Sequence, residues 1–187
     1  NTGRTDIFTL EWKQAAKAIL QTFITEQDHE NKSSYYFERK NCPFTDTLSR
    51  NGKGALVKSG IGMTWSGFRP SDDACIYGYL VPANMFACVI LNYMSVIADE
   101  IYKDSDLSAK ARILEEQINA SILEHAVLEH QKYGKVFAYE VDGYGQYNLM
   151  DDANVPSLLS IPYLGYCSSQ NPVYQNTRKM ILSETNP

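Results

Sequence analysis

Metal-ligating residues are few in this sequence. Its 187 residues include four cysteines and three histidines, with no Cys-x-x-Cys pair and no His-Glu-x-x-His motif. A metal site is therefore not expected, and catalytic thiol chemistry has no support. Cys75 and Cys88 stand among apolar residues, which is typical of small core side chains.

Long apolar runs and an excess of positive charge are also missing. The longest apolar stretch, residues 85–91, ends at Asn92 and is soon followed by Asp99 and Glu100, so no segment is predicted to span a membrane. Seventeen basic against 22 acidic residues leave a net charge of −5. This balance argues against a general affinity for nucleic acid or an anionic membrane. The sequence does not assign a compartment.

The common cofactor and nucleophile motifs are absent as well. No Gly-x-Gly-x-x-Gly follows a predicted strand, no glycine-rich phosphate loop precedes a Lys-Ser or Lys-Thr pair, and no Gly-x-Ser-x-Gly occurs. Dinucleotide, nucleoside triphosphate and serine-hydrolase chemistry therefore have no basis here. No cofactor is predicted.

Helices dominate what is present. Apolar spacing predicts amphipathic helices over residues 8–27 and 107–133, the second ending at Gly134 as its C-cap. Residues 74–102 are apolar on nearly all sides, which predicts a buried helix, although Gly78 and Pro82 predict an interruption near its start. The preceding Ser71-Asp72-Asp73 is expected to cap its start.

The other segments are shorter. Residues 29–62 predict an irregular connection. Residues 135–150 predict a hairpin around the turn dipeptide Asp142-Gly143. Short helices are expected over residues 155–164 and 174–182. The fold class that follows is all-α with one short β-hairpin.

Two segments share one local design. Residues 69–74 and 149–154 each place an acidic pair, Asp72-Asp73 and Asp151-Asp152, before an apolar segment. Helix capping alone explains such pairs in many proteins. Two carboxylate pairs are also suited to lining a polar site, and this alternative stays open.

Arginine and aromatic residues surround both pairs. Trp65, Phe68 and Arg69 lie near the first, and Tyr139, Tyr144 and Tyr147 near the second, among 13 tyrosines in all. Carboxylates grip sugar hydroxyls or transfer protons, while aromatic rings cover the apolar faces of pyranose rings. Two carboxyl groups on either side of a glycosidic bond are the requirement for its hydrolysis. The sequence therefore favours a sugar site, although most tyrosines of any protein serve packing.

Longer strings resemble a known family. Residues 62–74, with Trp65 and Arg69-Pro70-Ser71-Asp72-Asp73, continue into residues 77–87. Together with residues 139–145, 149–159 and 174–178 they resemble glycoside hydrolase family 125, the exo-acting α-1,6-mannosidases. The match covers most of the chain from Tyr36 onward.

The resemblance implies part of an (α/α)6 toroid with the hairpin near its pocket. It implies metal-independent hydrolysis of terminal α-1,6-linked mannose with inversion at the anomeric carbon. The general acid falls in Ser71-Asp72-Asp73, with Asp73 preferred and Asp72 as the alternative. The remaining candidates contact the substrate: Arg69, Asp151, Asp152 and Asn154 order the mannose, and Trp65 and Tyr144 cover its faces.

The sequence also departs from the family pattern. The family carries a Trp-Leu-Arg-Asp-Ser motif ahead of these strings and a His-Glu-Ser segment with the general base beyond them, and neither occurs here. Residues 1–187 are thus expected to be an internal segment of one (α/α)6 glycosidase domain. The rest of the same polypeptide is needed to complete the fold and the reaction.

The expected partner is a mannose-containing oligosaccharide or N-glycan. Two alternatives remain. One is a toroid that binds carbohydrate without catalysis, and the other is an (α/α)6 glycosidase with a different linkage specificity, because this fold hosts many activities.

Overall fold

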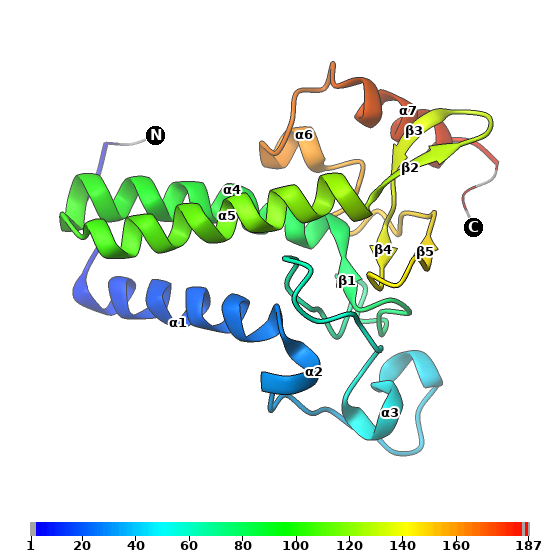
Figure 1. Cartoon of the computed structure of the whole chain (residues 1–187), viewed down its shortest axis with the longest axis horizontal. Helices are drawn as coiled ribbons and strands as arrows, with labels where there is room; N and C mark the ends of the chain where they lie inside the picture. Colours follow the sequence, from blue (N-terminus) through cyan, green and yellow to red (C-terminus); the bar gives the residue numbers. More distant parts are fainter. Residues whose placement is uncertain (1–2, 185, 187) are drawn as a thin grey trace.

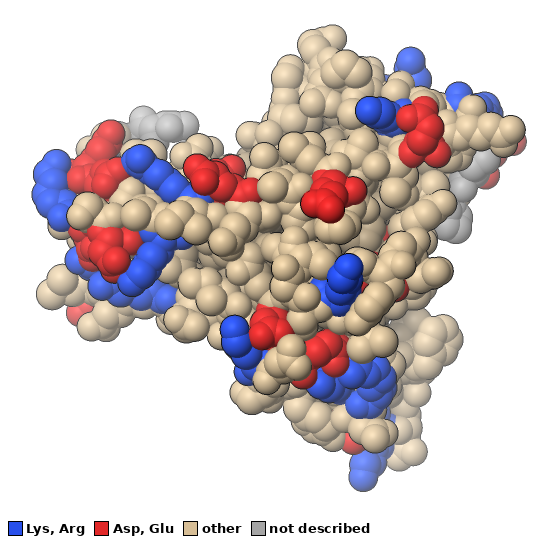
Figure 2. Space-filling view, viewed as in Figure 1, with Lys and Arg blue, Asp and Glu red and all other residues tan. Residues whose placement is uncertain are grey.

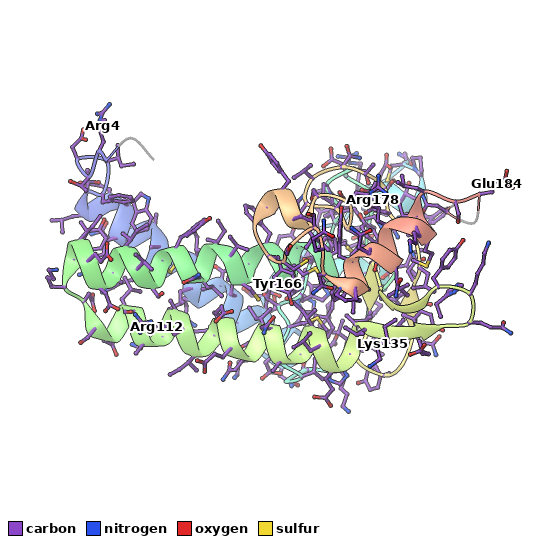
Figure 3. The ribbon with its side chains drawn as sticks, turned by 90° about the horizontal axis from the view of Figure 1, so that it is seen from above. Arg4, Arg112, Lys135, Tyr166, Arg178 and Glu184 are labelled. Carbon is purple, nitrogen blue, oxygen red and sulfur yellow. The ribbon has the colours of Figure 1, made fainter. Side chains whose placement is uncertain are left out.

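The computed structural model describes residues 3–184 and 186. Within this range, long helices form one half of the molecule, and short strands, loops and short helices form the other (Figure 1). The long helices are α1 (Leu10–Glu26), α4 (Val81–Ile97) and α5 (Ser105–His125). Helices α4 and α5 lie side by side and antiparallel, as the turned view in Figure 3 also shows.

Side-chain caps set the start of two of these helices. The Thr9 hydroxyl accepts a hydrogen bond from the Trp12 amide at 3.3 Å, so the predicted first helix is confirmed. The Asp104 carboxylate accepts one from the Leu107 amide at 3.0 Å at the start of α5. Both caps satisfy amides that have no partner inside the helix.

The buried helix begins later than predicted. It starts at Val81, with Pro82 in its first turn, where the missing proline N–H removes no helical hydrogen bond. Ser71, Asp72 and Asp73 lie ahead of it in a loop, so the prediction that they cap this helix is wrong.

Helix α4 continues without a break into the π-helix η2 (Ala98–Tyr102). The combined stretch of 22 residues contains an 18-residue segment with a mean hydropathy of 1.6, which is long and apolar enough to cross a membrane by length and composition alone. Of this segment, 61% is buried against the rest of the protein. Core helices pass the same test, so this is weak evidence for a membrane span. Burial is also one-sided, because Tyr93 and Val96 are exposed.

Helix α5 ends earlier than predicted. After His125 the chain forms a hairpin of β2 (Val127–His130) and β3 (Gly134–Phe137) in place of further helix. Gly134 has a φ of 74° and pairs with His130 at the hairpin turn, nine residues after α5 ends, so it does not cap that helix. His130 accordingly lies on a strand.

A second, three-stranded sheet joins distant parts of the chain. Strands β1 (Tyr79–Leu80), β4 (Glu140–Val141) and β5 (Tyr147–Asn148) pair antiparallel in the order β1-β4-β5. The predicted hairpin turn at Asp142-Gly143 is confirmed between β4 and β5, whereas residues 135–137 of the predicted hairpin belong to β3 and pair with β2. Strand β1 leads directly into α4, so the sheet fixes where that helix begins.

The C-terminal part is mostly loop with two short helices. Of the helix predicted over residues 155–164, only α6 (Ile161–Leu164) forms. The last predicted helix is confirmed as α7 (Pro172–Ile181), whose cap, Asn171, accepts hydrogen bonds from two amides. Arg178, on α7, is exposed (Figure 3).

Residues 33–62 are irregular, as predicted. They hold η1 (Phe44–Asp46) and α3 (Ser49–Gly52), and α2 (His29–Lys32) precedes them. These elements form the lower right part of Figure 1, beyond the end of α1. They lie beside the loops that carry the acidic residues.

The long helices form an open layer in the described part of the chain, so a closed toroid stays a prediction. Acidic and basic residues mix where α4 turns into α5 (Figure 2), for example as the Lys13–Asp104 pair at 2.8 Å. Charges of both signs therefore share this end of the molecule.

Candidate functional site

The first acidic pair lies in a tight turn. Phe68 and Ala74 pair as an antiparallel bridge, and the Arg69 amide donates to the Asp73 carbonyl at 2.8 Å. Asp72 has a φ of 69°, a left-handed conformation that Asp tolerates better than most residues. The turn leaves Asp72 exposed and Asp73 half-buried.

A fully buried carboxylate anchors this turn. Glu140, on β4, accepts a hydrogen bond from Arg69 Nε at 2.6 Å. The amides of Ile76 and Tyr77 donate to its other oxygen at 3.2 Å each. The Glu140 side chain is 0% exposed, so it needs both the counter-charge and the hydrogen bonds it receives. Glu140 thus ties the turn to the sheet.

A buried nitrogen of Arg69 and a nearby tyrosine hydroxyl have no hydrogen-bond partner among the described residues. These atoms are Arg69 Nη2 and the hydroxyl oxygen of Tyr139. The Arg69 guanidinium carbon lies 5.6 Å from the centre of the Tyr139 ring. Burial, and then the neighbouring Asp152, raise the pKa of Tyr139. Buried polar atoms left without a protein partner call for a bound water or ligand.

One serine joins the two acidic pairs. The Ser71 hydroxyl lies 2.9 Å from Asp152 Oδ2 and 3.3 Å from Asp73 Oδ2, and it can donate to either. Asp73 and Asp152 are far apart in the sequence. The structure therefore brings the two segments together at one place, as a shared site requires.

Asp151 has a different role from its neighbour. It is buried, and its two carboxylate oxygens accept hydrogen bonds from the amides of Leu158 and Leu159 at 3.0 and 3.1 Å. Burial raises the pKa of Asp151 to about 6, against the opposing effect of these two hydrogen bonds. Asp151 holds its own loop in shape, which argues against a direct contact with sugar.

Asp152 and Asn154 lie closer to the surface than Asp151. The Asn154 amide donates to Asp152 Oδ1 at 3.0 Å, and Asn154 is exposed. Asp152 therefore uses one oxygen within its loop and the other toward Ser71. The two residues remain candidates for ordering a ligand.

A hollow of about 540 Å³ opens beside the first acidic pair. Both Asp72 and Asp73 line it. The other lining residues are aromatic or polar: Tyr35, Phe37, Arg39, Asp46, Phe68 and Ser71. The volume suits a sugar-sized ligand.

The two aromatic candidates, Trp65 and Tyr144, do not line the hollow. Trp65 is buried, and its ring stacks on His29 with the centroids 3.7 Å apart. A Cβ added at Gly78 would come within 2.5 Å of the same ring. Trp65 is thus enclosed, and the expectation that it covers a sugar face disagrees with this placement. Tyr144 is 61% exposed but does not line the hollow.

Sequence reasoning missed three kinds of residue at this site. Glu140 stands inside a string that resembles the family, but its burial beside Arg69 depends on pairing across 71 positions. Ser71 stands inside the acidic string, but its position between Asp73 and Asp152 joins residues 81 positions apart. Tyr35 and Phe37 lie in a segment without periodicity, so no sequence signal marked them.

The comparisons with known proteins identify the family. The family model described as "Metal-independent alpha-mannosidase (GH125)" matches residues 1–187. The chain belongs to the GH125 family. Two GH125-like relatives show how far the likeness extends.

One relative is the meiotically up-regulated gene 157 protein of Schizosaccharomyces pombe. It is 42% identical over 191 residues, covering 97% of this chain and 37% of the relative. The other is a solved structure from Streptococcus pneumoniae, described as a metal-independent alpha mannosidase in a non-productive substrate complex with α-1,6-mannobiose. It is 45% identical with a TM-score of 0.96, covering 100% of this chain and 44% of that one. The chain thus spans less than half the length of both.

Proposed function

We propose that the full-length protein is an exo-acting α-mannosidase that releases terminal α-1,6-linked mannose with inversion. Membership of GH125 supports the α-mannosidase class, and the α-1,6-mannobiose bound to the Streptococcus pneumoniae protein supports the linkage. A mannose-containing oligosaccharide or N-glycan is the proposed substrate.

The observation that carries the proposal is the Ser71 bridge. It joins Asp73 to Asp152 beside a sugar-sized hollow, with Arg69 anchored behind them. This is one polar site built from two acidic segments, and capping alone does not require their meeting.

Asp73 is the proposed general acid, and Asp72 is the alternative. Asp73 is half-buried and lies within reach of Ser71, whereas Asp72 is exposed. The protonated acid gives its proton to the glycosidic oxygen as the bond to the anomeric carbon breaks. A carboxylate on the opposite face takes a proton from the attacking water. We assign that base, and the remainder of the (α/α)6 domain, to parts of the polypeptide outside residues 1–187.

The test is Asp73→Asn in the full-length protein, assayed on α-1,6-mannobiose and on α-mannosyl fluoride. We expect kcat on the disaccharide to fall about 10³-fold, because the leaving sugar needs the proton. Hydrolysis of the fluoride should persist, because fluoride leaves without one. Nuclear magnetic resonance of the first product should show β-mannose, the sign of inversion.

Asp72→Asn is the matched control, since Asn also accepts the left-handed conformation. If Asp72→Asn keeps its activity, Asp73 is supported as the general acid. If Asp72→Asn loses activity and Asp73→Asn does not, Asp72 is the general acid. Full activity of both variants removes the acid from this turn. Calorimetric binding of mannobiose without any hydrolysis would support a non-catalytic binding protein, and faster cleavage of another linkage isomer would revise the specificity.

A further inference from the structure

The hollow beside the acidic turn has a second wall that the proposed catalytic set does not use. Tyr35, Phe37, Arg39 and Asp46 form it, while Phe68 and the Ser71–Asp73 turn line the rest of the hollow. All four come from the irregular segment between α2 and α3. This wall is called the 35–46 wall below.

The 35–46 wall is fixed to the acidic turn. The Ala74 amide donates to the Thr45 carbonyl at 2.7 Å. The Phe37 and Phe68 rings meet edge to face, with centroids 5.3 Å apart. The Arg39 amide donates to Thr47 Oγ1 at 2.9 Å. The distance of the 35–46 wall from Asp72 and Asp73 is therefore set by the fold.

The wall also has a rigid support behind it. The Tyr35 ring lies 5.9 Å from the buried Trp65 ring, which itself stacks on His29. Both ring nitrogens of His29 have hydrogen-bond partners, Glu26 at 2.6 Å and the Lys53 carbonyl at 2.9 Å. Tyr35 remains 48% exposed, so its outer side is available to a ligand.

The polar groups on the wall match a sugar. Arg39 and Asp46 lie 3.8 Å apart at the surface, with side-chain exposures of 57% and 39%. The Arg39 guanidinium carbon lies 5.8 Å from the centre of the Phe37 ring. A donor and an acceptor beside aromatic faces can bind the hydroxyls and the apolar face of one pyranose ring.

The acidic turn contacts both this wall, through Phe68 and Ala74, and the 151–154 loop, through Ser71. Ser71 links the turn to Asp152 on the loop side, whereas Arg69, Asp152 and Asn154 do not line the hollow. A general acid protonates the oxygen between two sugars, so the two sugars lie on opposite sides of it. Resting on the proposed function, we propose that the 35–46 wall binds the leaving-group sugar, while the terminal mannose lies toward the 151–154 loop.

The experiment compares two substrates in the full-length protein, α-1,6-mannobiose and α-mannosyl fluoride. The fluoride has no second sugar to bind. We expect Phe37→Ala and Arg39→Gln each to lower kcat/KM on mannobiose about tenfold, as the loss of one contact does. On the fluoride, kcat/KM should stay within about twofold of wild type. Arg39→Gln leaves the aromatic packing in place, so it answers the question even if Phe37→Ala unfolds.

Tyr163→Ala is the matched control, because this aromatic residue is 88% exposed and lies outside the hollow. It should behave as wild type on both substrates. An equal loss on both substrates in the wall variants overturns the assignment to the leaving group, and no loss on either overturns the subsite. Wild-type protein that cleaves only the fluoride also refutes the subsite, whereas inactivity on both substrates refutes the proposed function itself.

Discussion

The two acidic pairs look alike in the sequence and are held in different ways. Asp72 and Asp73 occupy a turn that Glu140 anchors from another strand. Asp151 anchors its own loop through two amides, which leaves Asp152 alone to face the first pair.

The difference shows what an acidic pair needs in order to serve a site. Where an outside residue holds the backbone, both carboxylates can line the hollow. Where one member of the pair supplies the anchor, it is buried and its oxygens are occupied. Only one carboxylate of the second pair is then available for chemistry.

The largest expected effect comes from removing Glu140, which anchors the turn of the first acidic pair. In the full-length protein, Glu140→Ala leaves the Arg69 charge and the amides of Ile76 and Tyr77 without an acceptor. We expect the free energy of unfolding to fall by about 4 kcal/mol, as when a buried ion pair loses one partner. Denaturant unfolding measures this. Glu140→Gln keeps an acceptor oxygen and should lose less, and an unchanged stability of Glu140→Ala would show that the turn has another anchor.

The contribution of Asp151 to stability is expected to depend on pH. Asp151 has a pKa of about 6 in the folded protein, against an ordinary value of 3.8. Between these two values the folded state binds more protons than the unfolded state, so stability falls as pH rises. The total decrease in the free energy of unfolding that Asp151 causes is about 3 kcal/mol, and it is complete once the pH exceeds the folded pKa.

Asp151→Asn isolates this contribution, because it cannot titrate. The free energy of unfolding of wild type minus that of the variant should decrease by about 2.4 kcal/mol from pH 4 to pH 8. Asp72→Asn is the same chemical change in the first pair, and at pH 7 it should alter stability by less than about 0.5 kcal/mol. A flat difference for Asp151→Asn across this range contradicts the buried-anchor interpretation.

The smallest effect tests the link between the two pairs. Ser71→Ala removes the hydroxyl that lies between Asp73 and Asp152. We expect thermal unfolding of the full-length protein to report a loss of about 1 kcal/mol, the value of one hydrogen bond. Ser71→Thr keeps the hydroxyl and should recover most of it. If Thr and Ala destabilise equally, packing rather than the hydrogen bond connects the segments.

Much of the helical framework could be predicted because its signals are local. The apolar spacing of residues 8–27 and the short helix predicted over residues 174–182 depend on neighbours a few positions away. Strings such as residues 62–74 indicated the family for the same reason. The structure extends these predictions but does not alter them.

Other predictions failed where distant pairing overrides a local signal. Asp72 and Asp73 carry a good capping pattern, but β1 pairs with β4 and delays the helix to Val81. Gly134 is a plausible helix cap, but β2 and β3 pair around it. Trp65 was expected to cover a sugar face, but in the structure its ring packs against His29 and three glycines.

By itself, the sequence determined the family, the positions of most helices and the two acidic segments, since each of these is written in neighbouring residues. Only the tertiary structure decided that Glu140 holds Arg69, that Ser71 joins Asp73 to Asp152, and that residues 35–46 face the acidic turn. The reason is physical: these contacts join residues far apart in the chain, and a buried charge or an open hollow exists only after the chain has folded around it.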